Sequence, residues 1–128
     1  MLEQTERYES GTIRIASEVV KIIAGLAATE IKGVAGMSGG MVEGFTELLK
    51  KKSLAKGVKV EVGEKQCVID LFIVTEYGVK IPEIACQVQE NVKRAVESMT
   101  GLEVIEVNVH IQGVEIRNEE THETRVLG

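Results

Sequence analysis

Apolar and polar residues alternate along several segments of the chain, and each alternation predicts a β-strand with one buried face. The clearest segment runs from Val58 to Val62, where Lys59 and Glu61 separate three valines. The four residues 63–66 form a predicted tight reversal, so this strand pairs as a hairpin with a strand over residues 66–77. Shorter strands are predicted over residues 12–15 and 34–37, and a final strand buries Ile105, Val107, Val109 and Ile111.

Two longer segments repeat apolar residues every three or four positions, which predicts amphipathic helices. The first begins after Ser17, the predicted N-cap, and ends at Lys32-Gly33. The second has Pro82 in its first turn and ends at Thr100-Gly101. Its predicted buried residues are Ile84, Ala85, Val88, Val92, Ala95, Val96 and Met99. A third, short amphipathic helix is predicted from the spacing of Val42, Phe45, Leu48 and Leu49.

The resulting order, β-α-β-(short α)-β-β-α-β, predicts an α+β fold: a two-layer mixed β-sheet with two long helices packed on one face, plus the short amphipathic helix. The strand over 66–77, the second long helix and the final strand form a right-handed β-α-β crossover, so these two strands are predicted to be parallel. The domain is expected to cover residues 11–116. Residues 1–10 and 117–128 are polar and are expected to be flexible ends.

The strand over residues 66–77 is apolar on both faces. One face carries Cys67, Ile69, Leu71 and Ile73, and the other carries Val68, Phe72 and Val74 beside Asp70. A strand of this kind is typically central and covered on both sides. We therefore expect either the short helix or another subunit to cover the second face. The candidate interaction surface comprises Val68, Phe72, Val74, Val42, Phe45, Leu48 and Leu49.

Composition narrows the classes of function. The 128 residues, 44% hydrophobic and 27% charged, indicate one folded domain. Aromatic residues make up only 3% and the formal net charge is −5. These values argue against nucleic-acid binding, because phosphate contacts need clustered cations and base stacking needs rings. No segment has the pattern of a signal peptide or a membrane span, so a cytoplasmic location is expected.

Side chains with reactive chemistry are sparse. Cys67 and Cys86 match no redox or zinc spacing and are predicted to be small buried residues. His110 is predicted to be an ordinary surface residue, and His122 lies in the C-terminal tail. A general base needs a positioned partner in a cleft, and no such arrangement is visible. The sequence therefore predicts no catalytic residue, no metal site and no cofactor.

The glycine-rich segment at residues 33–45, GVAGMSGGMVEGF, is the one candidate for ligand binding. A P-loop is excluded because Phe45 stands where the motif needs its lysine. Gly36 to Gly39 fits the GXXG pattern with which KH domains grip a nucleic-acid backbone. The alternative function is therefore a KH-like nucleic-acid-binding regulator that uses Gly36, Gly39, Lys50, Lys51 and Lys52.

Four motifs in order, EIKGVAGM, GVKVEV, EYGVKIPE and TGLEVIEVNVHIQGV, closely resemble the alkaline shock protein family, the envelope stress response proteins of Gram-positive bacteria. The resemblance covers about residues 11–114. It implies a non-enzymatic protein of cell-envelope stress and membrane-lipid homeostasis. Such a protein self-associates or docks on a protein partner at the membrane or in fatty-acid synthesis.

The compact chain is more similar to the lipid-linked members of that family than to the stress members with long extensions. That likeness implies an interaction or scaffold protein that modulates fatty-acid synthesis at acetyl-CoA carboxylase. It also implies a cytoplasmic protein that reaches the membrane only through its partner. A bound acyl lipid or CoA near the glycines is a further hypothesis, and it has no residue signature.

Overall fold

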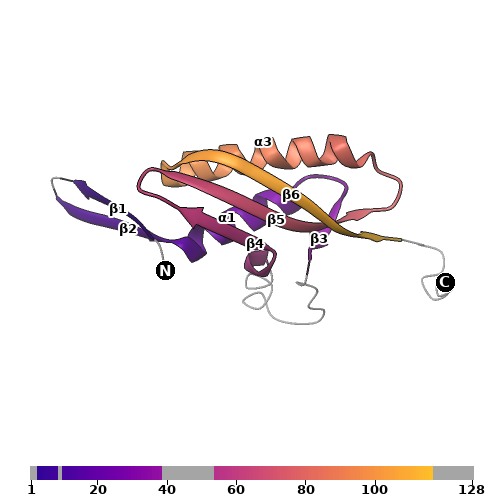
Figure 1. Cartoon of the computed structure of the whole chain (residues 1–128), viewed down its shortest axis with the longest axis horizontal. Coiled ribbons are helices and arrows are strands. Elements are labelled where there is room, and N and C mark those ends of the chain that lie inside the picture. Colours follow the sequence, from indigo (N-terminus) through magenta and orange to yellow (C-terminus); the bar gives the residue numbers. More distant parts are fainter. Residues whose placement is uncertain (1–2, 9, 39–53, 117–128) are drawn as a thin grey trace.

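The structure is a computed structural model that describes residues 3–8, 10–38 and 54–116 (Figure 1). Six strands and two long helices are assigned within these ranges. In chain order they are β1 Glu3–Tyr8, β2 Gly11–Ala16, α1 Ser17–Thr29, β3 Val34–Met37, β4 Val58–Val62, β5 Gln66–Glu76, α3 Ile81–Thr100 and β6 Glu103–Glu115. The predicted α+β class and the predicted order of these elements from residue 11 onward are confirmed.

Strand β5 is the centre of the main sheet. Along one edge it pairs in parallel with β6 over its whole length, as the predicted β-α-β crossover requires. Along the other edge it pairs antiparallel with two strands placed end to end. Residues 67–71 face β4 and residues 73–75 face β3. The sheet is therefore mixed, and among the described strands of this sheet β5 alone has partners on both edges.

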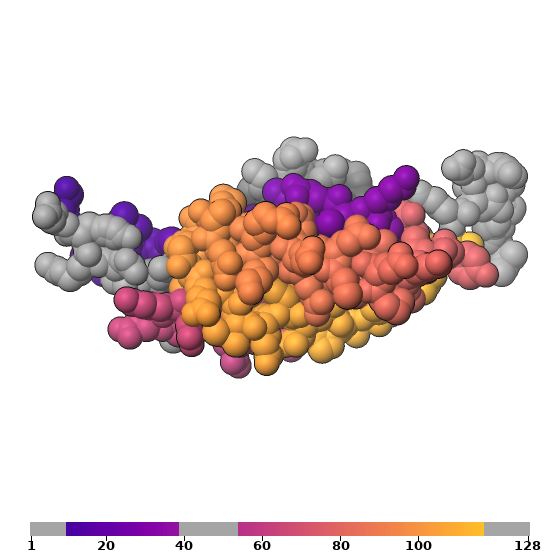
Figure 2. Space-filling view, turned by 90° about the horizontal axis from the view of Figure 1, so that it is seen from above, coloured from indigo at the N-terminus to yellow at the C-terminus, as the bar shows by residue number. Residues whose placement is uncertain are grey.

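Both helices pack on the same face of this sheet. Figure 2 shows α3, in coral to orange, lying between α1 in purple and β6 in yellow. Asn91 ties the two helices together, because its Nδ2 donates to the Ala27 carbonyl at 2.8 Å and to Glu30 Oε1 at 3.2 Å. The core beneath the helices is fully buried and aliphatic, with Ile69, Leu71, Ile73, Val88, Val92, Val96 and Leu102 among its largest side chains.

The N-terminus differs from the prediction. Residues 1–10 are predicted to be flexible, whereas Glu3–Tyr8 forms β1 and pairs antiparallel with β2 in a separate two-stranded sheet. This ribbon extends away from the body at the start of α1 (Figure 1). Helix α1 also starts one residue earlier than predicted: Ala16 is the N-cap, and Ser17 is the first helical residue. The predicted tail at residues 117–128 lies outside the described residues.

Strand β6 contains two β-bulges that change the predicted phase of its side chains. Cys67 pairs with Val104, but Val68 pairs with Glu106, so Ile105 is the extra residue of the first bulge. Val104 is consequently buried at 2% exposure, whereas Ile105 is 46% exposed. The predicted inward position of Ile105 is therefore wrong. Beyond the bulge Val107 is buried, as predicted.

Helix α3 buries a narrower stripe than predicted. Ile84, Val88, Val92 and Val96 are buried, but Met99 is 67% exposed. Thr100 is the buried residue of the last turn instead, and Gly101 ends the helix in the left-handed conformation. Cys86 also lies on the exposed side of the helix, which contradicts its predicted burial, whereas Cys67 is buried as predicted.

Candidate functional site

The second face of the sheet is not covered by any helix in the part of the chain that the structure describes. Along β5 the odd-numbered residues 67–75 are buried under the helices, and the even-numbered residues 68–76 on the other side are half-buried. We call this second side the open face. Val68, Phe72 and Val74, three of the candidate surface residues, lie on it.

Strand register places the side chains of the open face in rows across the sheet. Val68 lies between Glu61 and Glu106, and Asp70 lies between Lys59 and Asn108. The following rows are Phe72 with His110, then Val74 between Gly36 and Gly113, then Glu76 with Glu115. On this face β5 therefore carries three apolar side chains together with Asp70 and Glu76, and charged residues of β4 and β6 lie beside them.

Phe72 is held by contacts with both neighbouring strands. The His110 ring stacks on it with centroids 4.5 Å apart and planes at 12°, and Lys59 Nζ lies 5.5 Å from the ring centroid. His110 Nε2 is also 3.1 Å from Asp70 Oδ1. The sequence prediction treats His110 as an ordinary surface residue, but the structure places it against Phe72. These contacts fix the orientation of the Phe72 ring on the open face.

The chain leaves the sheet and returns to it at Phe72. Ser38, after β3, donates its backbone N–H to the Phe72 carbonyl at 2.8 Å, and the Phe72 N–H donates to the Gly57 carbonyl at 2.8 Å. Gly57 is required there because an added Cβ would lie 2.9 Å from the Phe72 oxygen. The remaining candidate surface residues, Val42, Phe45, Leu48 and Leu49, lie outside the described residues.

The first half of the predicted KH-like clasp lies in a strand and not in a loop. Gly36 and Met37 belong to β3 and pair with Val74 and Ile73, whereas the GXXG clasp needs a free turn. The other predicted contacts, Gly39, Lys50, Lys51 and Lys52, lie outside the described residues. The carboxylates of the open face would repel a phosphate backbone.

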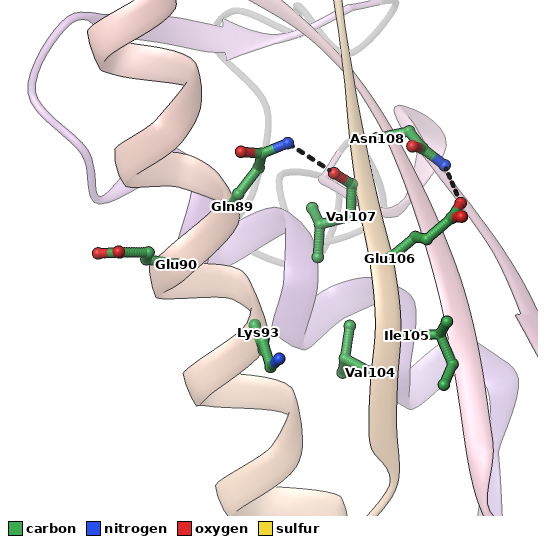
Figure 3. A pocket seen from close by; sticks show the side chains of 8 residues that line it. All are labelled: Gln89, Glu90, Lys93, Val104, Ile105, Glu106, Val107 and Asn108. Carbon is green, nitrogen blue, oxygen red and sulfur yellow. Dashed lines mark hydrogen bonds between the residues drawn. The ribbon is translucent and has the colours of Figure 1, made fainter.

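A groove between α3 and the outer edge of β6 is an evident hollow on the helix side (Figure 3). Gln89 reaches across it and donates its Nε2 to the Val107 carbonyl at 3.0 Å. Further along α3, Glu97 Oε2 accepts the Val104 N–H at 2.9 Å. Both side chains occupy backbone groups that another strand would need, so α3 protects this part of the edge from pairing.

Reactive groups are few in the described ranges. No cluster of three or more His, Cys, Asp or Glu side chains there has the geometry of a metal site. Burial, with a smaller contribution from Glu97, raises the pKa of the Cys67 thiol from 9.0 to about 11. This thiol therefore stays protonated and unreactive near neutral pH. Nor is any helix in the described ranges long and apolar enough to cross a membrane.

Comparisons with known proteins agree with the resemblance seen in the sequence. The model of the alkaline shock protein family, which is described by a "cell envelope-related function", matches residues 5–116. The chain is 42% identical over 105 residues to YqhY of Bacillus subtilis, covering 82% of this chain and 78% of that protein. It is 40% identical over 114 residues to YloU of the same organism, covering 88% and 95% of the two chains.

A stress response regulator gls24 homolog of Streptococcus pyogenes is 38% identical over 114 residues. The alignment covers 88% of this chain but 63% of that protein. The shared part is thus most of the present chain, and the S. pyogenes protein is the longer of the two.

Proposed function

Because the chain belongs to the alkaline shock protein family, whose function is related to the cell envelope, we propose that it is a non-enzymatic interaction protein that docks on a protein partner through its open face. The observation that carries this proposal is the second side of β5. Phe72, Val68 and Val74 lie there half-buried, and no described helix covers them. A strand that is apolar on both faces is typically covered on both sides, so this surface is suited to a partner.

The non-enzymatic part of the proposal is supported by where the titratable groups lie. One close pair, His110 and Asp70, has side chains that are 43% and 32% exposed on the open face of the sheet. A general base is effective in a cleft that positions a substrate and excludes water. The contact with Phe72 gives this pair a different role, because it holds the ring in place for a partner.

The identity of the partner is a finer proposal, taken from the resemblance to the lipid-linked members of the family. We expect a protein at the membrane or in fatty-acid synthesis, with acetyl-CoA carboxylase as the first candidate to test. The protein would then be a cytoplasmic scaffold that reaches the membrane through this partner. Self-association remains part of the proposal, and sedimentation of the purified protein measures it directly.

Site-specific photo-crosslinking in the cells that make the protein tests the proposed face. A photoreactive phenylalanine analogue replaces Val68 or Asn108 on the open face, and Gln87 on the exposed side of α3 serves as the matched control position. We expect the same cross-linked protein from both open-face positions and none of it from the control. Adding Phe72→Asp should abolish the cross-link. Equal cross-links from Gln87, or none from the open face, would contradict the proposal.

A further inference from the structure

We propose that the open face binds an arginine side chain of its protein partner, in a trough over Val74 that has Gly36 and Gly113 on its two sides. This inference rests on the proposed docking function and specifies the chemistry of the partner. The trough lies between the stacked Phe72 and His110 rings at one end and the Glu76–Glu115 row at the other.

We infer the trough from the glycine that each strand beside Val74 carries in the same row. Gly36 of β3 and Gly113 of β6 each pair with Val74. Each glycine also comes directly after a shift in strand register, between Val34 and Gly36 in β3 and between Ile111 and Gly113 in β6. Bulges of this kind re-aim the side chains of a sheet, and here they leave Val74 without a side chain directly opposite it on either strand.

Neither the backbone angles nor the described neighbours require glycine at these two positions. Neither has a positive φ, since the positive-φ glycines of the described residues are Gly11, Gly33, Gly78 and Gly101. Among the described residues, a Cβ added at Gly36 would meet no atom within 4 Å, and one added at Gly113 would make only ordinary contacts, at 3.8 and 3.9 Å, with Val74. Glycine weakens a strand, and in strand interiors it often marks the close approach of another molecule.

Charge determines which class of partner fits the trough. Register and alternation place six carboxylates on the open face of the described residues, against the single lysine Lys59. The six are Glu61, Asp70, Glu76, Glu103, Glu106 and Glu115. Anionic membrane surfaces and nucleic acids would be repelled by such a face. A basic segment of a protein is the complementary partner.

The end of the trough favours arginine over other cations. Glu76 and Glu115 are neighbours across β5 and β6, and within the described residues neither side chain has a hydrogen-bond or ion-pair partner. Two carboxylates on adjacent strands offer several acceptors side by side, which matches the planar fork of a guanidinium. The aliphatic part of the arginine then lies over Val74, where no side chain from the described part of this protein competes for the space.

An NMR titration of the ¹⁵N-labelled full chain at low ionic strength tests this inference. The probe is an acetylated and amidated Gly-Leu-Arg-Leu-Gly peptide, and the control peptide carries citrulline, the neutral analogue of arginine. We expect the arginine peptide to shift the amide signals of Gly36, Val74 and Gly113. The citrulline peptide should leave them unchanged, and added salt should weaken the binding.

Two sets of variants separate the trough from the general acidity of the protein. Glu76→Gln with Glu115→Gln should weaken binding about tenfold or more, since charge-assisted hydrogen bonds are lost. The matched pair Glu18→Gln with Glu90→Gln, on the exposed sides of the helices, removes the same charge and should have little effect. Gly36→Val should fold normally and abolish binding, because its side chain fills the trough. Gly113→Ala provides the same test with a smaller change.

Three results would overturn the arginine proposal: no shift with the arginine peptide, equal shifts with the citrulline peptide, or unchanged binding by folded Gly36→Val and Gly113→Ala. If cross-linking from Val68 and Asn108 persists in that case, the open face still docks a partner and only its arginine chemistry is wrong. If the cross-links are absent as well, the docking function itself fails.

Discussion

The hydroxyl of Thr75 is a buried polar group without a partner, and it allows a test of the packing beneath the open face. Thr75 is on the helix side of β5 with 0% of its surface exposed, and among the described residues its Oγ1 has no hydrogen-bond partner. A buried hydroxyl in this state costs roughly 1–3 kcal/mol of desolvation. Thr75→Val keeps the shape of the side chain and replaces the hydroxyl with a methyl group.

We expect Thr75→Val to raise the free energy of unfolding by about 1 kcal/mol, or the Tm by about 4 °C for a domain of this size. Thr100→Val is the matched control. Thr100 is also buried, but its Oγ1 donates to the Val96 carbonyl at 2.7 Å and accepts the Leu102 N–H at 3.1 Å. The same substitution there should lower stability by about 1–3 kcal/mol, because it leaves a buried N–H unpaired.

Urea unfolding followed by circular dichroism measures both values, and an unchanged m-value confirms that the two variants unfold to the same extent. The opposite signs are the essential prediction, because the two substitutions are chemically identical. If Thr75→Val destabilised the protein as much as Thr100→Val does, the Thr75 hydroxyl would have to make a hydrogen bond in solution. The surroundings of Thr75 beneath the helices would then differ from those in the structure.

Three further predictions follow from burial and backbone geometry. Val104→Ala should lower the free energy of unfolding by about 2 kcal/mol, whereas Ile105→Ala at the bulge should change it by less than about 0.5 kcal/mol. Urea unfolding of the two variants measures both changes. Cys86 should react with a thiol reagent in the folded protein, and Cys67 only after unfolding, so reagent titration should count one thiol and then two. Gly33→Ala should lower the Tm by several degrees in a thermal melt, because its φ is +107° and an added Cβ would lie 2.8 Å from a side-chain atom of α3.

Local patterns predict the main elements well where a buried face imposes a period. The alternation at Val58–Val62, the two-sided apolar strand β5 and the long stripe of α3 all have such a face, and all are present. Strand β1 has no comparable signal. It pairs only with β2 in a ribbon of two strands, so its polar residues show no apolar period.

Bulges limit what alternation can predict for the candidate site. Val104 and Ile105 are adjacent apolar residues, and this interruption of the period is the only sequence trace of the first bulge in β6. The pairing of His110 with Phe72 depends on the first bulge, and that of Gly113 with Val74 depends on both. Each pairing also depends on the parallel register of β5 and β6. An error of one residue in that register moves every side chain to the other face. The members of the open face on β5 were therefore predictable, and their neighbours on β6 were not.

Alternation along β5 also assigns stability and binding to different residues of one strand. Thr75 lies under the helices, and its neighbours Val74 and Glu76 lie on the open face. Substitutions at odd-numbered positions of β5 should therefore change the free energy of unfolding, whereas those at even-numbered positions should chiefly change binding. Gly36→Val makes the distinction sharpest, because valine favours a strand and its Cβ meets no atom of the described residues there. A variant that becomes more stable yet loses its partner would show that the glycine is kept for binding rather than for folding.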